Sequence, residues 1–305
     1  MTDITLHLTT LLGCEGPAAA RGADPDTGFV MRLLMLCALP RTNPRRRAKY
    51  VRRHGAYKLV IMPNPDHGLP YGPLPRLILA WMCSEAAWTQ ARSLAPGRSL
   101  HDFMKRIGLP DAGGVPEARR LQNQLDRLCD IMVEISYPDD GEERVVSGLV
   151  VDHRELWWNP ERPQEPAARE NRVLLGSRLY RGALRHPVPV DIRTLRELAH
   201  SPLGLDLYSF LACRGFSMAG PRLLTWVQLY ELLGDHPAKV ADGDVVNSFR
   251  TRCLREIRKI QTSWPGLQYR VVRGGLEVGP SEPPVTREEP PWRDPVLPSG
   301  SGLPS

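Results

Sequence analysis

Apolar and polar positions along the chain predict the same succession of elements twice. In the first copy, a run that is apolar on most sides begins at Leu74 and predicts a core helix. A short helix is predicted over Leu100–Gly108, because a serine suits its N-cap and a glycine ends it. A longer helix follows over Glu117–Cys129, with apolar residues at helical spacing on one side. The alternating runs Ile131–Tyr137 and Val145–Asp152 then predict a β-hairpin.

The second copy repeats these elements in the same order. Leu203–Cys213 predicts a core helix, and Thr225–Gly234 predicts a short helix closed by glycine. Val245–Ile260 predicts the long helix, with apolar residues on one side and cations on the other. Gln268–Arg273 and Gly275–Val278 predict a second hairpin.

Short helices, a longer helix with a cationic outer side and a hairpin are the parts of a winged-helix fold, which places the long helix in the major groove of DNA. The sequence therefore predicts an α+β, mainly helical protein with tandem winged-helix domains. The predicted parts are a flexible leader over 1–27, an N-terminal winged-helix domain over 28–158, a linker over 159–170, a C-terminal winged-helix domain over 171–279 and a Pro-rich disordered tail over 280–305.

The outer sides of the two long helices carry the candidate base-reading residues. The first helix contributes Arg119, Arg120, Asn123 and Arg127. The second contributes Arg250, Arg252, Arg255, Arg258 and Lys259. We expect Arg119, Asn123 and Arg127 to contact bases in one major-groove segment, and Arg252, Arg255 and Lys259 to do so in the next.

A basic arm is predicted over residues 41–58, where no acidic residue occurs. Its candidate phosphate ligands are Arg45, Arg46, Arg47, Arg52 and Arg53. Clustered cations without counter-charges gain free energy when they displace ions from a nucleic acid. The other interpretation is a solvated charge run. The formal net charge of the chain, +6, favours a polyanionic partner but is modest for this length.

Composition argues against several other classes. The cysteines are scattered, with no C-x-x-C and no histidine at zinc-ligand spacing, so neither a metal nor a cofactor is expected. No segment is typical of a membrane span or a secretory signal, which predicts a cytoplasmic protein with no membrane partner. No P-loop and no nucleophile motif is present, so we do not expect an enzyme. The acidic turn Pro138–Arg144 loosely imitates a metal-dependent nuclease site, but Asp-Asp-Gly is also a hairpin turn.

Several blocks of the sequence resemble the RepA-type plasmid replication initiators. They are Gly68–Trp81, Ser99–Leu109, Arg120–Leu128, Pro187–Arg193 and Ser201–Tyr208, within a region from about residue 55 to 278. The resemblance implies a protein that binds repeated sites in the double-stranded DNA of a plasmid origin, melts an adjacent AT-rich segment and recruits host replication factors, among them the host initiator and the replicative helicase.

Three functions remain open from the sequence. The first is an origin-binding initiator, which two unequal reading domains in one chain would suit because a directional repeat lacks two-fold symmetry. The second is a winged-helix transcriptional repressor without a replication role. The third is a metal-dependent nuclease. A homodimer is a possible assembly for the first two.

Overall fold

The structure is a computed structural model that describes residues 27–31, 39–45, 47–54, 57–109, 114–139, 142–185, 187–215, 220–235, 243–282 and 284. The predicted leader up to residue 26, Arg46, the tip of the acidic turn at residues 140–141 and the tail from residue 285 lie outside the described residues. Below, the first half means the residues up to 158 and the second half those from 171 onward.

The three predicted helices of the first half are confirmed. They are α3 (Leu74–Thr89), α4 (Leu100–Arg106) and α5 (Val115–Cys129). The side chain of Ser99 accepts a hydrogen bond from the Asp102 backbone N–H, and the Asp102 carboxylate accepts one from the Ser99 backbone N–H, so α4 begins with a capping box. This local signal fixes where α4 starts.

The predicted first hairpin is confirmed, but it forms part of a larger sheet. Its strands are β5 (Met132–Asp139) and β6 (Glu142–Leu149). They join β2 (Tyr50–His54) and β3 (Tyr57–Met62) in an antiparallel sheet of order β2-β3-β5-β6. Part of the predicted basic arm is therefore an edge strand of this sheet.

The extended run is interrupted at Val150, so the strand predicted to reach Asp152 is divided between two sheets. The strand β7 (Val151–Glu155) pairs with β8 (Arg172–Leu175), which pairs with β4 (Ser93–Leu94). The segment between β7 and β8, predicted as a linker, lies against α4: the backbone N–H of His101 donates to the Pro163 carbonyl. The division into two domains stays a prediction.

The second half begins with α6 (Ser177–Arg185), β9 (Pro187–Asp191) and α7 (Ile192–Glu197). The Asp191 side chain accepts from the Arg193 backbone and caps α7. The predicted core helix is α8 (Pro202–Gly215).

The rest of the second half follows the predicted order. It consists of β10 (Arg222–Thr225), α9 (Trp226–Leu233), α10 (Gly243–Ser263), β11 (Tyr269–Val272) and β12 (Gly275–Val278). A capping box between Thr225 and Gln228 starts α9. The predicted hairpin of β11 and β12 is confirmed, with β10 on its other edge, so the sheet order is β10-β12-β11.

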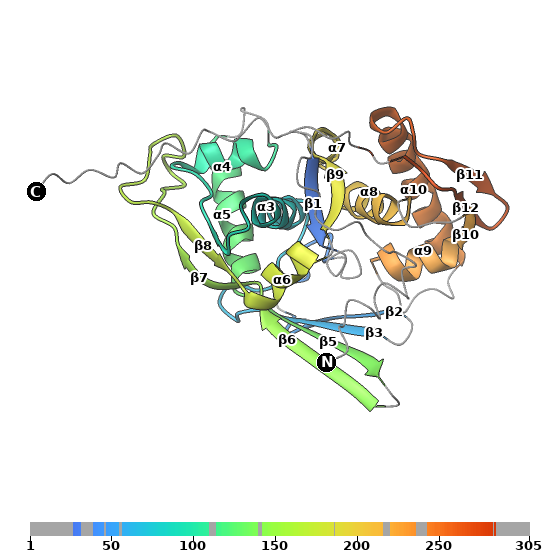
Figure 1. Cartoon of the computed structure of the whole chain (residues 1–305), viewed down its shortest axis with the longest axis horizontal. Helices are drawn as coiled ribbons and strands as arrows, with labels where there is room; N and C mark the ends of the chain where they lie inside the picture. The colour runs from blue at the N-terminus through green and yellow to red at the C-terminus, as the bar shows by residue number, and fades with distance from the viewer. Residues whose placement is uncertain are drawn as a thin grey trace, which may run out of the picture.

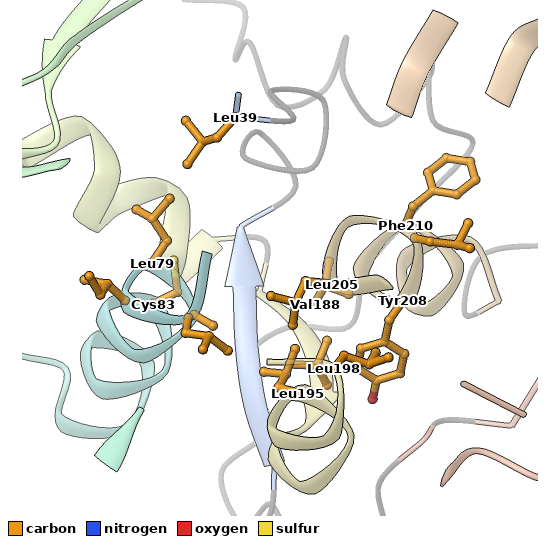
Figure 2. Packing of buried hydrophobic residues seen from close by; sticks show 14 of the residues in the cluster. Leu39, Leu79, Cys83, Val188, Leu195, Leu198, Leu205, Tyr208 and Phe210 are labelled. Carbon is orange, nitrogen blue, oxygen red and sulfur yellow. The ribbon is translucent and has the colours of Figure 1, made fainter. Parts of the chain in front are cut away.

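The core runs across the middle of the molecule. There β1 (Thr27–Met31) pairs with β9, so the first strand lies beside the second half (Figure 1). Leu79 and Cys83 of α3 pack on one side of this strand pair, and Leu205 and Tyr208 of α8 on the other (Figure 2). Buried side chains of both halves thus form a continuous apolar cluster.

The fold is of the mixed α+β class, and every strand pairing in the described residues is antiparallel. Within that same part of the chain, no helix is long and apolar enough to cross a membrane.

Candidate nucleic-acid interface

The helix α10 separates an apolar side from a cationic side. Its buried apolar residues are Val246, Phe249, Cys253, Ile257 and Ile260. They face α8 and α9, and the Phe249 ring meets that of Tyr230 on α9 edge to face, with 5.2 Å between centroids. The predicted inward stripe is thus confirmed. The opposite side exposes Arg250, Arg255, Arg258 and Lys259.

A buried carboxylate holds two of these cations in place. Glu256 is 2% exposed, and its oxygens lie 3.4 Å from Arg255 Nε and 3.2 Å from Lys259 Nζ. The side chain of Arg255 itself is 68% exposed. Because the carboxylate lies beneath the surface and the cations above it, both cations remain accessible to a polyanion.

The remaining exposed arginines of α10 are arranged differently. The Arg250 guanidinium lies 5.7 Å from the centre of the Trp226 ring, a cation–π contact with the first residue of α9. No carboxylate pairs with Arg258 in the described part of the chain.

Arg252 is engaged within the protein, unlike its neighbours. Its Nη1 lies 3.3 Å from an oxygen of Asp235, in the segment between α9 and α10. The other Asp235 oxygen lies 3.2 Å from Arg41. A base-reading role for Arg252 would require it to leave this ion pair.

Two exposed cations of the second hairpin were absent from the predicted site. Arg270 on β11 pairs with Glu277 of β12 at 2.8 Å, and Arg273 is exposed in the turn beside Gly274, whose φ is 92°. The signal was present in the sequence, because both cations fall in the predicted hairpin that follows the long helix.

On α5, the outer arginines near the helix start are balanced by carboxylates. Arg119 Nε donates to Glu161 at 2.6 Å, and the pair is exposed at 62% and 51%. Arg120 pairs with Glu117 one turn earlier on the same helix at 2.9 Å. Exposed ion pairs of this kind contribute little stability and are open to exchange with phosphate.

Arg127 is engaged within the protein, so a base-reading role would require it to leave its present contacts. Arg127 donates to the Leu69 carbonyl at 3.1 Å and to the Asn123 side chain at 2.8 Å, and its guanidinium lies 5.4 Å from the Tyr71 ring centre. The neighbouring Gln124 accepts from the Tyr71 backbone at 2.8 Å. This part of α5 therefore fastens the loop that leads into α3, and Asn123 is a partner in that contact.

The predicted arm contains both exposed and buried cations. Arg45, Arg47 and Arg53 are exposed. Arg52 is 4% exposed and donates to the carbonyls of Leu232 at 2.6 Å and Gly234 at 2.5 Å. These carbonyls lie at the end of α9, where a helix leaves its acceptors unpaired and carries negative partial charge. Arg52 thus has a structural role here, and a phosphate contact would require it to leave these carbonyls.

Arg41, at the start of the arm, is also buried between the halves. Its side chain is 8% exposed and lies between Asp235 and Asp206. Burial lowers the pKa of Arg41 below its usual value, against the opposing effect of the two carboxylates. Asp206 in turn pairs with Arg76 of α3, with Nε 2.6 Å from an oxygen. The arm therefore joins the two halves and offers cations only along its exposed positions.

Metal-binding groups were not expected. The described residues contain no cluster of three or more histidine, cysteine or acidic side chains that could hold an ion. The acidic turn considered for a nuclease lies partly outside these residues.

Comparison with known proteins gives a matching family and, among similar solved structures, two of RctB. The family model described as "Plasmid encoded RepA protein" matches residues 69–228. A crystal structure of RctB domains 2–3 (RctB-155-483) is similar with a TM-score of 0.48 and 12% identity, over 81% of this chain and 97% of that chain. A selenomethionine derivative of RctB domains 2 and 3 gives a TM-score of 0.47 and 12% identity, over 83% and 98%. No curated protein matches the chain.

Proposed function

The chain belongs to the family of plasmid-encoded RepA proteins, and from this membership we propose that it initiates plasmid replication by binding the DNA of the plasmid origin. The matched region runs from the loop before α3 into α9, and so includes α5. The observation that carries the proposal is this family match. The cationic outer side of α10 supports it.

The second half supports a winged-helix interpretation. Its order α8, β10, α9, α10, β11, β12 and its sheet order β10-β12-β11 are those expected when a strand precedes the second helix and a hairpin follows the third. We infer that α10 enters the major groove and that the hairpin lies beside it. The first half has the same chain order, but β4 pairs with β8 instead of the hairpin, so it would be a variant of that fold.

The proposed DNA surface is centred on α10. Its members there and in the adjoining hairpin are Arg250, Arg255, Arg258, Lys259, Arg270 and Arg273. Arg119 and Arg120 on α5 form a second region, in which DNA phosphates would displace the carboxylate partners of these arginines. The exposed cations Arg45, Arg47 and Arg53 would contact phosphates. Recruitment of host replication factors belongs to the proposal through family resemblance, and the proposal also allows a homodimer.

Footprinting on the DNA that flanks the gene tests this function. A series of spaced protections in one direction supports an origin, because an initiator reads repeated sites. A single palindromic protection would instead favour the repressor, whose two-fold symmetry requires it. A second experiment supplies the protein to cells that hold a plasmid with this origin but no initiator gene. Failure of that plasmid to replicate, with the folded protein present, would contradict the proposal.

The Arg255→Ala/Arg258→Ala variant links the function to α10. We expect the protections to weaken on the origin DNA, because both guanidinium groups are exposed on the proposed reading side. Arg162→Ala is the matched control, since Arg162 is an exposed arginine outside the helices and is balanced by Glu165. Equal protection by the wild type, the double variant and the control would show that these α10 arginines do not contact the DNA.

A further inference from the structure

The outer face of α6 carries a row of arginines that neither reading helix includes. Arg178, Arg181 and Arg185 follow one another at spacings of three and four residues, and all are exposed. Leu179 and Ala183 on the other side are buried. Residues three and four positions apart share one face of a helix, so the three cations form a single stripe.

This stripe has no carboxylates in its own sequence neighbourhood. No Asp or Glu occurs between Glu170 and Asp191. In the described part of the chain, no carboxylate pairs with Arg178 or Arg181, and Arg181 Nε donates to the Ser177 carbonyl at 3.2 Å. Arg178 lies in the first helical turn, where the helix dipole disfavours a cation. The stability of α6 alone therefore gives no reason for a cation at this position.

Arg178, the first arginine of the stripe, is positioned by contacts of its aliphatic side-chain carbons. A Cβ at Gly148 of β6 would lie 3.1 Å from the Cδ of Arg178 and 3.6 Å from its Cβ and Cγ. The aliphatic part of Arg178 thus lies on the backbone of the hairpin, while the residue remains exposed. A side chain that is ordered before binding loses less conformational entropy when it meets a ligand.

The helix lies where the two halves meet. It packs on α3 and β6 of the first half, on β9 of the second half and on β1 (Figure 1). A duplex that engages both α5 and α10 has to pass the middle of the protein. In the view of Figure 1, α6 lies between α5 and α10.

We propose that the outer face of α6 is a further contact for the phosphate backbone of DNA, a proposal that rests on the function proposed above. Guanidinium groups suit this ligand because their planar donors match two phosphate oxygens at once. Such contacts carry no sequence information and fix how the duplex lies on the protein. The α6 stripe would thus hold the DNA between its two reading positions.

The test uses the full chain with Arg178→Gln and Arg181→Gln together, measured against origin DNA and against unrelated duplex. Glutamine keeps much of the stem, so the unfolding midpoint should not change. We expect affinity for both duplexes to fall by a similar factor, on the order of tenfold at 0.15 M salt, and the slope of log K against log salt to lose about 0.9 for each lost contact. The footprint should keep its positions. Arg162→Gln is the control and should behave like the wild type.

The outcomes separate this inference from the proposed function. If the wild type protects origin DNA and the double variant binds with the same affinity and salt slope, α6 does not contact the backbone. Unchanged DNA binding with loss of plasmid replication would also overturn the inference, because it would indicate an acidic protein partner for the stripe. Absence of any protection by the wild type would instead contradict the proposed function.

Discussion

Arg52 and Arg53 are adjacent on β2 and lie on opposite faces of its sheet. Arg52 reaches the second half and donates to the carbonyls of Leu232 and Gly234, whereas Arg53 is exposed. Successive side chains of a strand alternate between faces, so one residue of a basic run becomes structural while the next stays accessible. Net charge along a segment therefore does not tell which of its cations can meet DNA.

This pair gives the first prediction. Arg52→Ala should lower the free energy of unfolding by about 3 kcal/mol, because it removes charged hydrogen bonds and leaves buried carbonyls without a donor. Arg53→Ala should change it by less than about 0.5 kcal/mol, and should weaken binding to all DNA sequences alike. Urea unfolding and binding measured on the same preparations check both effects. Equal destabilisation by the two variants would contradict the assignment of faces.

How well the sequence predicts a feature depends on how far apart in sequence the interacting residues lie. The starts of α4 and α9 were predictable because their capping boxes involve residues three positions apart. The inward stripe of α10 was predictable because helical spacing alone determines it. The burial of Arg52 was not, since its acceptors lie about 180 residues away in sequence.

The strands were harder to predict where their partners are distant. Pairing of β9 depends on β1, and β2 lies in a cation-rich segment that has few strand signals. The same limit applies to α5, whose polar side was predicted as free. Part of that side instead holds the loop before α3, through contacts to Leu69 and Tyr71.

The second prediction distinguishes Arg127, which stabilises the loop before α3, from Arg258, which is proposed to contact DNA. Arg127→Ala should destabilise the protein by about 1–2 kcal/mol, because it removes the hydrogen bond to Leu69 and the contact with the Tyr71 ring. Arg258→Ala should leave stability unchanged and reduce DNA affinity. Thermal unfolding and binding assays on both variants check this. A specific loss at one base position with unchanged stability in Arg127→Ala would restore the original interpretation of that residue.

The third prediction concerns the buried ion pair between the halves. Asp206→Ala leaves Arg76 and Arg41 without their shared carboxylate, so we expect a loss of about 3–5 kcal/mol. The Arg76→Met/Asp206→Leu variant should recover part of this loss, because it removes the unpaired charge. Urea unfolding of the single and double variants measures the coupling. A double variant that is less stable than Asp206→Ala would show that the charges themselves are required.

The fourth prediction is a pH dependence at the end of α5. Burial works against ionisation of Asp130, but hydrogen bonding and charge from Arg154, together with His67, hold the pKa of Asp130 below its ordinary value. A carboxyl with a lowered pKa stabilises the fold above its unfolded pKa of about 3.9, and this contribution disappears as the pH falls through the folded value.

Asp130→Asn should therefore cost about 1–2 kcal/mol at pH 7, and the difference from the wild type should shrink below about pH 4. Urea unfolding at a series of pH values measures it. Asp66→Asn, at an exposed residue nearby, is the control and should stay within about 0.5 kcal/mol of the wild type at pH 7. A difference that grows on acidification would mean that the pKa of Asp130 is raised.

The last prediction treats Glu161 as a competitor for DNA. Its carboxylate binds Arg119 on the outer side of α5, at a position where a phosphate could bind in its place. Because the pair is exposed, water and salt already weaken it. Removing the carboxylate frees Arg119 and removes a negative charge that repels DNA, so DNA should bind more tightly. Glu161→Gln should raise DNA affinity a few-fold, with little effect on stability.

The control for Glu161 removes the same charge elsewhere. Glu165→Gln deletes the partner of Arg162, which lies outside α5, and long-range repulsion changes by a similar amount. If affinity rises equally in both variants, the effect comes from net charge and Arg119 has no particular role. A rise confined to Glu161→Gln that disappears when Arg119→Gln is added would place Arg119 in contact with DNA, since only then does freeing its guanidinium create a phosphate ligand.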